Sequence, residues 1–181
     1  DALTFFAPDI PVKIFPSWDC LPYDRLSPNS GISSRRLSLL TDLAQNASSK
    51  YIILTTVNAA TQRIPNRLVL SSATFQAEVG QRIDLDQLYS FFSKMGFSKN
   101  STVSEPGDYA VRGGIIDIFP PGEAGPIRLD LFGDILDGVR QFDPITQRTV
   151  SKMRDIRLAP ASEVFLDEAS ITRFRQNYRK E

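Results

Sequence analysis

Apolar and polar residues alternate most regularly between Tyr109 and Phe142. Alternation with a period of two residues is typical of β-strands that bury one face. Turn-forming residues divide the stretch into short segments at 120–122 (PPG) and 133–134 (GD). The pattern therefore predicts a β-meander, in which consecutive antiparallel strands are joined by turns.

The segment Ile127–Phe132 predicts which side chains of the meander point outward. One of its faces is entirely apolar, and the other carries Arg128, Asp130 and Phe132. If the apolar face lies in the core, Phe132 is exposed beside Arg128. Aromatic residues and arginine are enriched at the energetic centres of protein–protein interfaces. The pattern therefore favours recognition over catalysis.

Before the meander, the chain predicts two mixed regions. The first alternates strands and helices, which predicts a small parallel α/β layer. Its expected elements are strands at Leu3–Ala7, Val12–Phe15 and Tyr51–Val57, the last buried on both faces, and helices at Ile32–Ala44 and Ala59–Arg63, with Asn58 as the N-cap of the second helix. Arg35 and Arg36 are expected on the outward side of the Ile32–Ala44 helix.

The second region predicts an α+β unit in which one helix packs on an antiparallel sheet. It begins with strands at Leu68–Leu70 and Phe75–Val79, followed by a helix at Leu85–Met95 with Asp84 as its N-cap, and a strand at Phe97–Val103. The step Arg112-Gly113-Gly114 predicts a β-bulge or a close approach of another backbone segment, and a bulge would turn Arg112 toward the face of Arg128. A last amphipathic helix is expected over Leu166–Tyr178.

Composition removes several classes of function. The 181 residues include 21 basic and 21 acidic residues, so no overall field attracts nucleic acid or an acidic membrane. Histidine is absent, which excludes histidine-based triads and the commonest zinc ligand. Neither GxxxxGK[ST] nor GxGxxG occurs, so no phosphate-binding loop is visible. We therefore expect no catalytic activity and no cofactor in this chain.

The start of the chain and its single cysteine indicate what kind of protein it comes from and in which compartment. The chain lacks an initiator Met and begins within a strand-like pattern, so we expect a piece of a longer polypeptide. No apolar run approaches the length of a membrane span, and no leader is recognisable. The lone Cys20 has no partner for an internal disulfide, and we expect it to be a buried apolar residue in a cytoplasmic protein.

Three alternative interpretations remain open from the residues alone. The outward arginines Arg128 and Arg140 could form a solvated face, paired with Asp130 and Asp137. A loop with Trp18 and Tyr23, followed by Arg25, Arg35 and Arg36, could stack single-stranded nucleic acid, although packing by its own aromatic residues is favoured. A metal site could be considered from Asp84, Asp86, Asp130, Asp134 and Asp137, but it is disfavoured. Asp84 is expected to cap a helix, and the alternation of the strands places the other carboxylates in different turns and on different faces.

Five blocks of sequence carry a resemblance to a known family. They are FPSWDCLPYDRLSPN (15–29), ILTTVNAATQRIP (53–65), YAVRGGIIDIFP (109–120), RLDLFGD (128–134) and FDPITQRT (142–149). In this order they resemble the N-terminal UvrB-homology module of the bacterial transcription-repair coupling factors, the Mfd family. The resemblance covers nearly the whole chain.

The resemblance implies a three-part architecture. It implies a degenerate P-loop-NTPase-like α/β layer, with domain 1a at 1–68 and the start of domain 1b at 159–181, and an inserted antiparallel α+β domain 2 at 69–158. UvrB itself carries a Walker A loop and a DNA-inserting hairpin, and neither is found here. ATP, magnesium and the translocase motor of the family would lie outside this chain.

The resemblance also implies partners and contact residues. It implies a non-catalytic adaptor that binds the excision-repair protein UvrA through Arg112, Arg128 and Phe132, with Arg140 on the rim. A C-terminal domain of the parent protein would mask this surface, and other domains would bind RNA polymerase and DNA. The rival interpretations are a DNA-binding module and an autoinhibitory clamp on the parent translocase.

Overall fold

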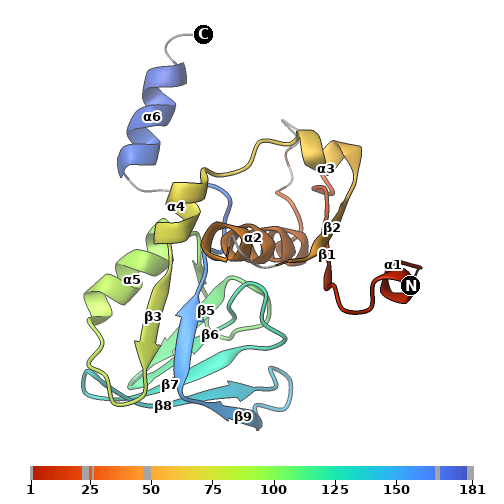
Figure 1. The fold of residues 1–181 in the computed structure, drawn as a ribbon. Helices are drawn as coiled ribbons and strands as arrows, with labels where there is room; N and C mark the ends of the chain where they lie inside the picture. The colour runs from red at the N-terminus through yellow and green to blue at the C-terminus, as the bar shows by residue number, and fades with distance from the viewer. Residues whose placement is uncertain (1, 22–24, 26, 47–49, 166–167, 179–181) are drawn as a thin grey trace.

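The computed structural model describes residues 2–21, 25, 27–46, 50–165 and 168–178 and shows a mixed α/β fold (Figure 1). Its helices are α1 (Ala2–Phe6), α2 (Ser30–Gln45), α3 (Val57–Thr61), α4 (Arg67–Ser72), α5 (Leu85–Lys94) and α6 (Glu168–Tyr178). Its strands are β1 (Val12–Phe15), β2 (Ile52–Thr55), β3 (Phe75–Glu78), β4 (Ser98–Lys99), β5 (Asp108–Arg112), β6 (Ile115–Ile118), β7 (Ile127–Phe132), β8 (Ile135–Phe142), β9 (Thr149–Met153) and β10 (Asp155–Leu158). The predicted fold class, mixed α/β with an antiparallel unit, is confirmed.

The larger core lies against a six-stranded sheet in the order β4-β5-β6-β7-β8-β9. From β5 to β9 every pair is antiparallel, as the meander predicts, and only β4 and β5 run parallel. Helix α5 and the antiparallel ribbon of β3 and β10 pack on one face of this sheet (Figure 1). We call that face the inner face and the opposite one the outer face.

The alternation of the sequence matches the two faces of this sheet. Ile116, Leu129 and Leu136 are fully buried against Leu88 and Phe92 of α5. The cap of α5 is also confirmed, since Asp84 accepts a hydrogen bond from the Gln87 amide at 3.0 Å. Burial of the apolar face therefore fixes the orientation of each strand. The residues on the opposite side of each strand then form the outer face.

The smaller core forms around α2, which lies between the sheet and the parallel pair of β1 and β2 (Figure 1). Leu37 and Leu40 of α2 pack here with Phe15, Leu70 and Phe165. Phe165 follows the last strand of the larger unit, so the chain returns to the first core after building the second. The three-part division at 68 and 158 remains a prediction.

Two short segments predicted as strands are helices. Leu3–Ala7 falls within α1 and the turn after it, where the Ala7 amide bonds the Leu3 carbonyl at 2.8 Å. Leu68–Leu70 lies in α4, which Asn66 caps by accepting from the Leu68 amide at 2.8 Å. Short apolar runs are compatible with a strand or a helix. At Leu68–Leu70, the cap at Asn66 favours the helix.

Three further expectations about local structure are wrong. Strand β2 is not buried on both faces: Ile53 and Leu54 are 39% and 44% exposed, because β1 is its only paired neighbour among the described residues. Thr56, not Asn58, caps α3. The alternative expectation at the two glycines, a close backbone approach, is confirmed, because a Cβ on Gly114 would lie 2.7 Å from the Leu131 carbonyl oxygen. The β-bulge itself is wrong: Gly113 and Gly114 form the two-residue turn between β5 and β6, with Gly113 at φ +59°. Glycine adopts that conformation without strain.

Candidate protein-binding site

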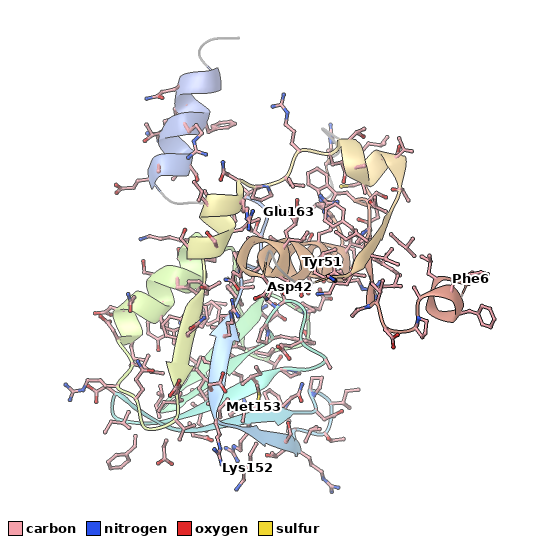
Figure 2. The ribbon with its side chains drawn as sticks, viewed as in Figure 1. Phe6, Asp42, Tyr51, Lys152, Met153 and Glu163 are labelled. Carbon is pink, nitrogen blue, oxygen red and sulfur yellow. The ribbon has the colours of Figure 1, made fainter. Side chains whose placement is uncertain are left out.

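A row of charged side chains crosses the outer face of the sheet. Strand register places Asp117 of β6 opposite Arg128 of β7, Arg128 opposite Arg140 of β8, and Arg140 opposite Lys152 of β9. Figure 2 labels Lys152 on β9 at the edge of the sheet. Directly opposed cross-strand residues have Cβ atoms about 5 Å apart, so these side chains are neighbours.

Arg128 is held rigidly at the centre of this row. Its Nε and Nη2 donate to the two carboxylate oxygens of Asp117 at 2.6 and 2.8 Å, and Nη2 also donates to Oε1 of Gln147 at 2.9 Å. The guanidinium lies 4.5 Å from the ring centroid of buried Phe142. The hydrogen bond with Asp117 is the main reason that the pKa of Arg128 is raised. A bidentate pair of this kind fixes the plane of the guanidinium.

Arg140 has its own carboxylate partner. Its Nη2 donates to Asp130 at 2.7 Å, while its buried Nε has no hydrogen-bond partner within the described structure. Alternating carboxylates thus offset the repulsion between Arg128 and Arg140, which are directly opposed. The ion-paired interpretation is therefore correct for Asp130, whereas Asp137 forms no ion pair with any described residue. Paired arginines can still present their remaining donors to a partner.

The other predicted residues lie toward the β7–β8 turn. Phe132 is 80% exposed and lies opposite Ile135, which is 43% exposed. Ile115, on the same face, is 37% exposed and pairs with Arg112 across the glycine turn. Arg112 is exposed and donates to the Ser101 carbonyl at 2.5 Å. The outer face therefore has an apolar end beside a row of fixed cations.

Sequence reasoning missed Asp117, Gln147 and Lys152. Alternation within β6 places Asp117 away from the buried Ile116 and Ile118, so its outward direction could have been predicted. Its pairing with Arg128 depends on strand register, which alternation does not give. Gln147 offers no signal in the sequence, yet it takes a positive φ of 58°.

The chain is similar to known proteins over most of its length. Residues 75–164 match the family model described as the UvrB interaction domain. Transcription-repair-coupling factors from Haemophilus influenzae, Escherichia coli and Myxococcus xanthus are 40%, 37% and 34% identical to the chain over 93%, 90% and 84% of its length. This chain belongs to the transcription-repair-coupling factor family. It spans only 15%, 14% and 13% of those three relatives.

All four predicted contact residues of the coupling-factor chain lie within the matched domain. Arg112, Arg128, Phe132 and Arg140 fall between residues 75 and 164, on strands β5, β7 and β8. The matched range also contains Asp117, Gln147 and Lys152, which complete the row. The family match and the exposed face therefore concern the same unit of the coupling factor.

The aromatic loop of the coupling-factor chain is used internally. Trp18 donates through Nε1 to Glu163 at 3.0 Å, and the guanidinium of Arg36 lies 4.4 Å from the Phe15 ring centroid. Arg36 is fully buried, so its predicted outward direction is wrong; it donates to Glu163 at 2.6 Å. Tyr23 lies outside the described residues. Because Arg36 is buried, it is not available to the alternative nucleic-acid site, which loses one of its three arginines.

The described residues contain no group of three metal-binding side chains, and none of their helices has the length and apolarity needed to cross a bilayer. Cys20 is half-buried.

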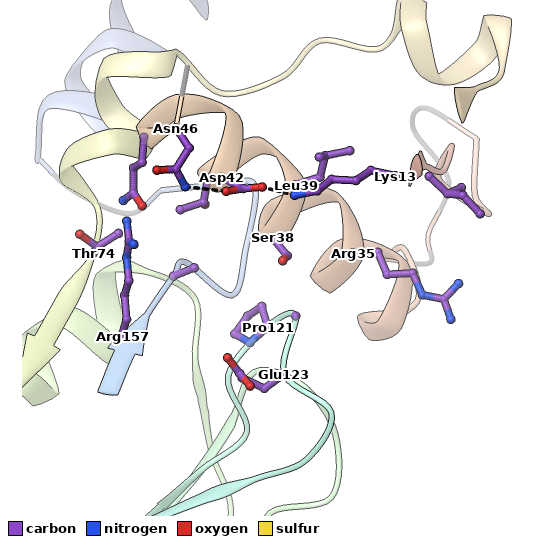
Figure 3. A pocket seen from close by; sticks show the side chains of 15 residues that line it. Lys13, Arg35, Ser38, Leu39, Asp42, Asn46, Thr74, Pro121, Glu123 and Arg157 are labelled. Atoms are coloured by element: carbon purple, nitrogen blue, oxygen red, sulfur yellow. Dashed lines mark hydrogen bonds and ion pairs between the residues drawn. The ribbon is translucent and has the colours of Figure 1, made fainter. Parts of the chain in front are cut away.

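A cavity of about 570 Å³, lined by both polar and apolar residues, lies between α2 and the turn at Pro121 (Figure 3). At its centre Asp42 forms an ion pair with Lys13 and accepts from Asn46 at 2.7 Å. The bond from Lys13 is the first cause of a lowered pKa at Asp42. The carboxylate is thus ionised and already committed to two donors, which suits a structural role better than that of a general base.

Proposed function

We propose that this chain is a non-catalytic adaptor that binds UvrA through the outer face of its six-stranded sheet. The observation that carries the proposal is the 80% exposure of Phe132 on the face that also carries a row of cations, of which Arg128 and Arg140 are fixed by carboxylates. A large exposed aromatic side chain beside arginine has the composition of an interface centre. The family resemblance implies UvrA as the partner, and the match of residues 75–164 to the UvrB interaction domain supports it.

Docking would use the donors that the internal ion pairs leave open. Asp117 occupies Nε and Nη2 of Arg128, and Nη1 bonds to no described residue. Arg112 and Lys152 form no ion pair with described residues either. These groups would form charge-assisted hydrogen bonds with acidic groups of UvrA. Phe132, with Arg140 on the rim, would fill an apolar pocket of the partner.

The wider role follows from the family and concerns the whole protein. In a complete coupling factor, other domains would bind DNA and RNA polymerase and hydrolyse ATP, and this domain would recruit UvrA in the cytoplasm to lesions where transcription has stalled. A C-terminal domain of the parent would cover the same face in the resting state. The adaptor and clamp roles are compatible, because one surface can serve two partners in turn.

The test truncates the exposed phenylalanine. We expect Phe132→Ala to weaken UvrA binding by about 1–3 kcal/mol in a calorimetric titration, because the apolar contact is lost. Phe6→Ala is a matched control, since Phe6 is also 80% exposed but lies on α1, away from the sheet (Figure 2). Equal affinities for both variants and the unchanged chain would reject the proposal.

A further inference from the structure

The loop between β8 and β9 displays an apolar residue that the proposed contact set does not include. Ile145 is 90% exposed, more than Phe132. Scattered apolar residues are ordinary on protein surfaces, so exposure alone carries little weight. The structure of the surrounding loop is what distinguishes Ile145.

Hydrogen bonds within the loop fix the position of Ile145. Asp143 accepts from the amides of Ile145 at 3.1 Å and Thr146 at 2.6 Å, and from the Thr146 hydroxyl at 2.9 Å. The Gln147 amide donates to the Asp143 carbonyl at 2.8 Å, which closes the turn. The bonds from Thr146 are the main cause of a lowered pKa at Asp143, which stays ionised at neutral pH. A loop ordered before binding loses less conformational entropy on docking.

The same loop is attached to the proposed docking face. Gln147 donates from Nε2 to the Pro144 carbonyl at 2.8 Å, and its Oε1 accepts from Arg128 at 2.9 Å. Its backbone has a φ of +58°, which is uncommon for a residue other than glycine. Backbone strain of this kind persists only where surrounding contacts enforce it. Gln147 therefore couples the loop to the central arginine of the face.

Ile145 and Phe132 lie at opposite ends of the outer face. Phe132 adjoins the start of β8 through its partner Ile135, whereas the loop of Ile145 follows the end of β8 at Phe142. Seven residue steps separate these ends, which corresponds to roughly 23 Å of extended strand. Between the two apolar tips lies the row from Asp117 to Lys152.

We infer that the 143–148 loop is a second apolar anchor for UvrA, with Ile145 at its tip and Gln147 as a positioning residue. This inference rests on the proposed function and extends it to the far end of the face. The matching UvrA surface would carry acidic groups between two apolar sites, because the open donors of Arg112, Arg128 and Lys152 lie between or beside the tips. Such a surface would explain why an exposed isoleucine lies in a loop that is hydrogen-bonded to a fixed arginine.

The experiment titrates UvrA with variants of this 181-residue chain. We expect Ile145→Ala to raise the Kd about 10-fold, whereas Ile64→Ala, which truncates an isoleucine that is 51% exposed between α3 and α4, should leave it within about 2-fold. Gln147→Gly tolerates the positive φ but removes the bond to Arg128, so we expect about a 3-fold rise in Kd with no loss of thermal stability.

The outcomes separate this inference from the proposed function. If Phe132→Ala weakens binding and Ile145→Ala behaves as Ile64→Ala does, the second anchor is rejected and the proposed function stands. If neither Phe132→Ala nor Ile145→Ala changes the Kd, both proposals fail. An Ile145→Ala effect with an unchanged melting temperature supports the anchor.

Discussion

Arg128 has an internal partner in addition to the external role that we propose for it, which changes how its substitution should be interpreted. Asp117 is 4% exposed, and its carboxylate accepts two hydrogen bonds from Arg128. A buried carboxylate that loses its partner pays a large desolvation penalty. If substitution of Arg128 reduced UvrA binding, the loss could therefore come from the missing contact or from a less stable fold.

We expect Arg128→Ala to lower the free energy of unfolding by about 3 kcal/mol, the low end for a broken buried pair, because the Arg128 side chain keeps 19% exposure. Urea denaturation measures this loss. The double variant Arg128→Ala with Asp117→Asn should recover part of the stability, since the uncompensated charge is removed. A single variant as stable as the unchanged chain would show that the pair contributes little.

At the scale of elements, periodic segments were predictable from the sequence and short ones were not. The alternation over Ile127–Phe132 predicted both faces of β7, and Asp84 correctly marked the start of α5. The runs at Leu3–Ala7 and Leu68–Leu70 are too short for period to decide between strand and helix. Outward direction was therefore predictable for Phe132, while the partners of Arg128 were not, because register is set by turn lengths.

The direction of Arg36 failed for a different reason. Helical period alone gives no sign that Glu163, which lies 127 residues later, reaches α2. Arg36 also donates to the Pro16 carbonyl at 2.8 Å and to Gln62 at 2.9 Å, so all of its partners lie on other elements. A buried arginine satisfied by distant residues is a tertiary feature, which local pattern does not encode.

The Arg36–Glu163 pair joins α2 to the segment that follows the sheet. We expect Glu163→Ala to cost about 3–5 kcal/mol in urea unfolding, because Arg36 would stay buried without its carboxylate. Glu105→Ala is a matched control: Glu105 is exposed and accepts from Ser30 at 2.8 Å, so its loss should cost less than about 1 kcal/mol. Similar losses for the two variants would contradict the structural role of the pair.

At the scale of the molecule, we expect recognition of a partner to depend on the local arrangement of charges and not on overall charge. Acidic and basic residues balance at 21 each, yet strand register gathers three cations into one row on the outer face. The inner face, packed on α5 and the β3–β10 ribbon, leaves this row free to meet a partner. The central claim is that UvrA contacts this face directly at Phe132.

Site-specific photocrosslinking tests that contact most directly. A photoreactive phenylalanine analogue would replace Phe132 in one preparation and Phe6 in another, because both positions are 80% exposed and tolerate a larger ring. We expect a UvrA adduct from position 132 and little or none from position 6. An adduct from position 6 without one from position 132 would contradict the central claim.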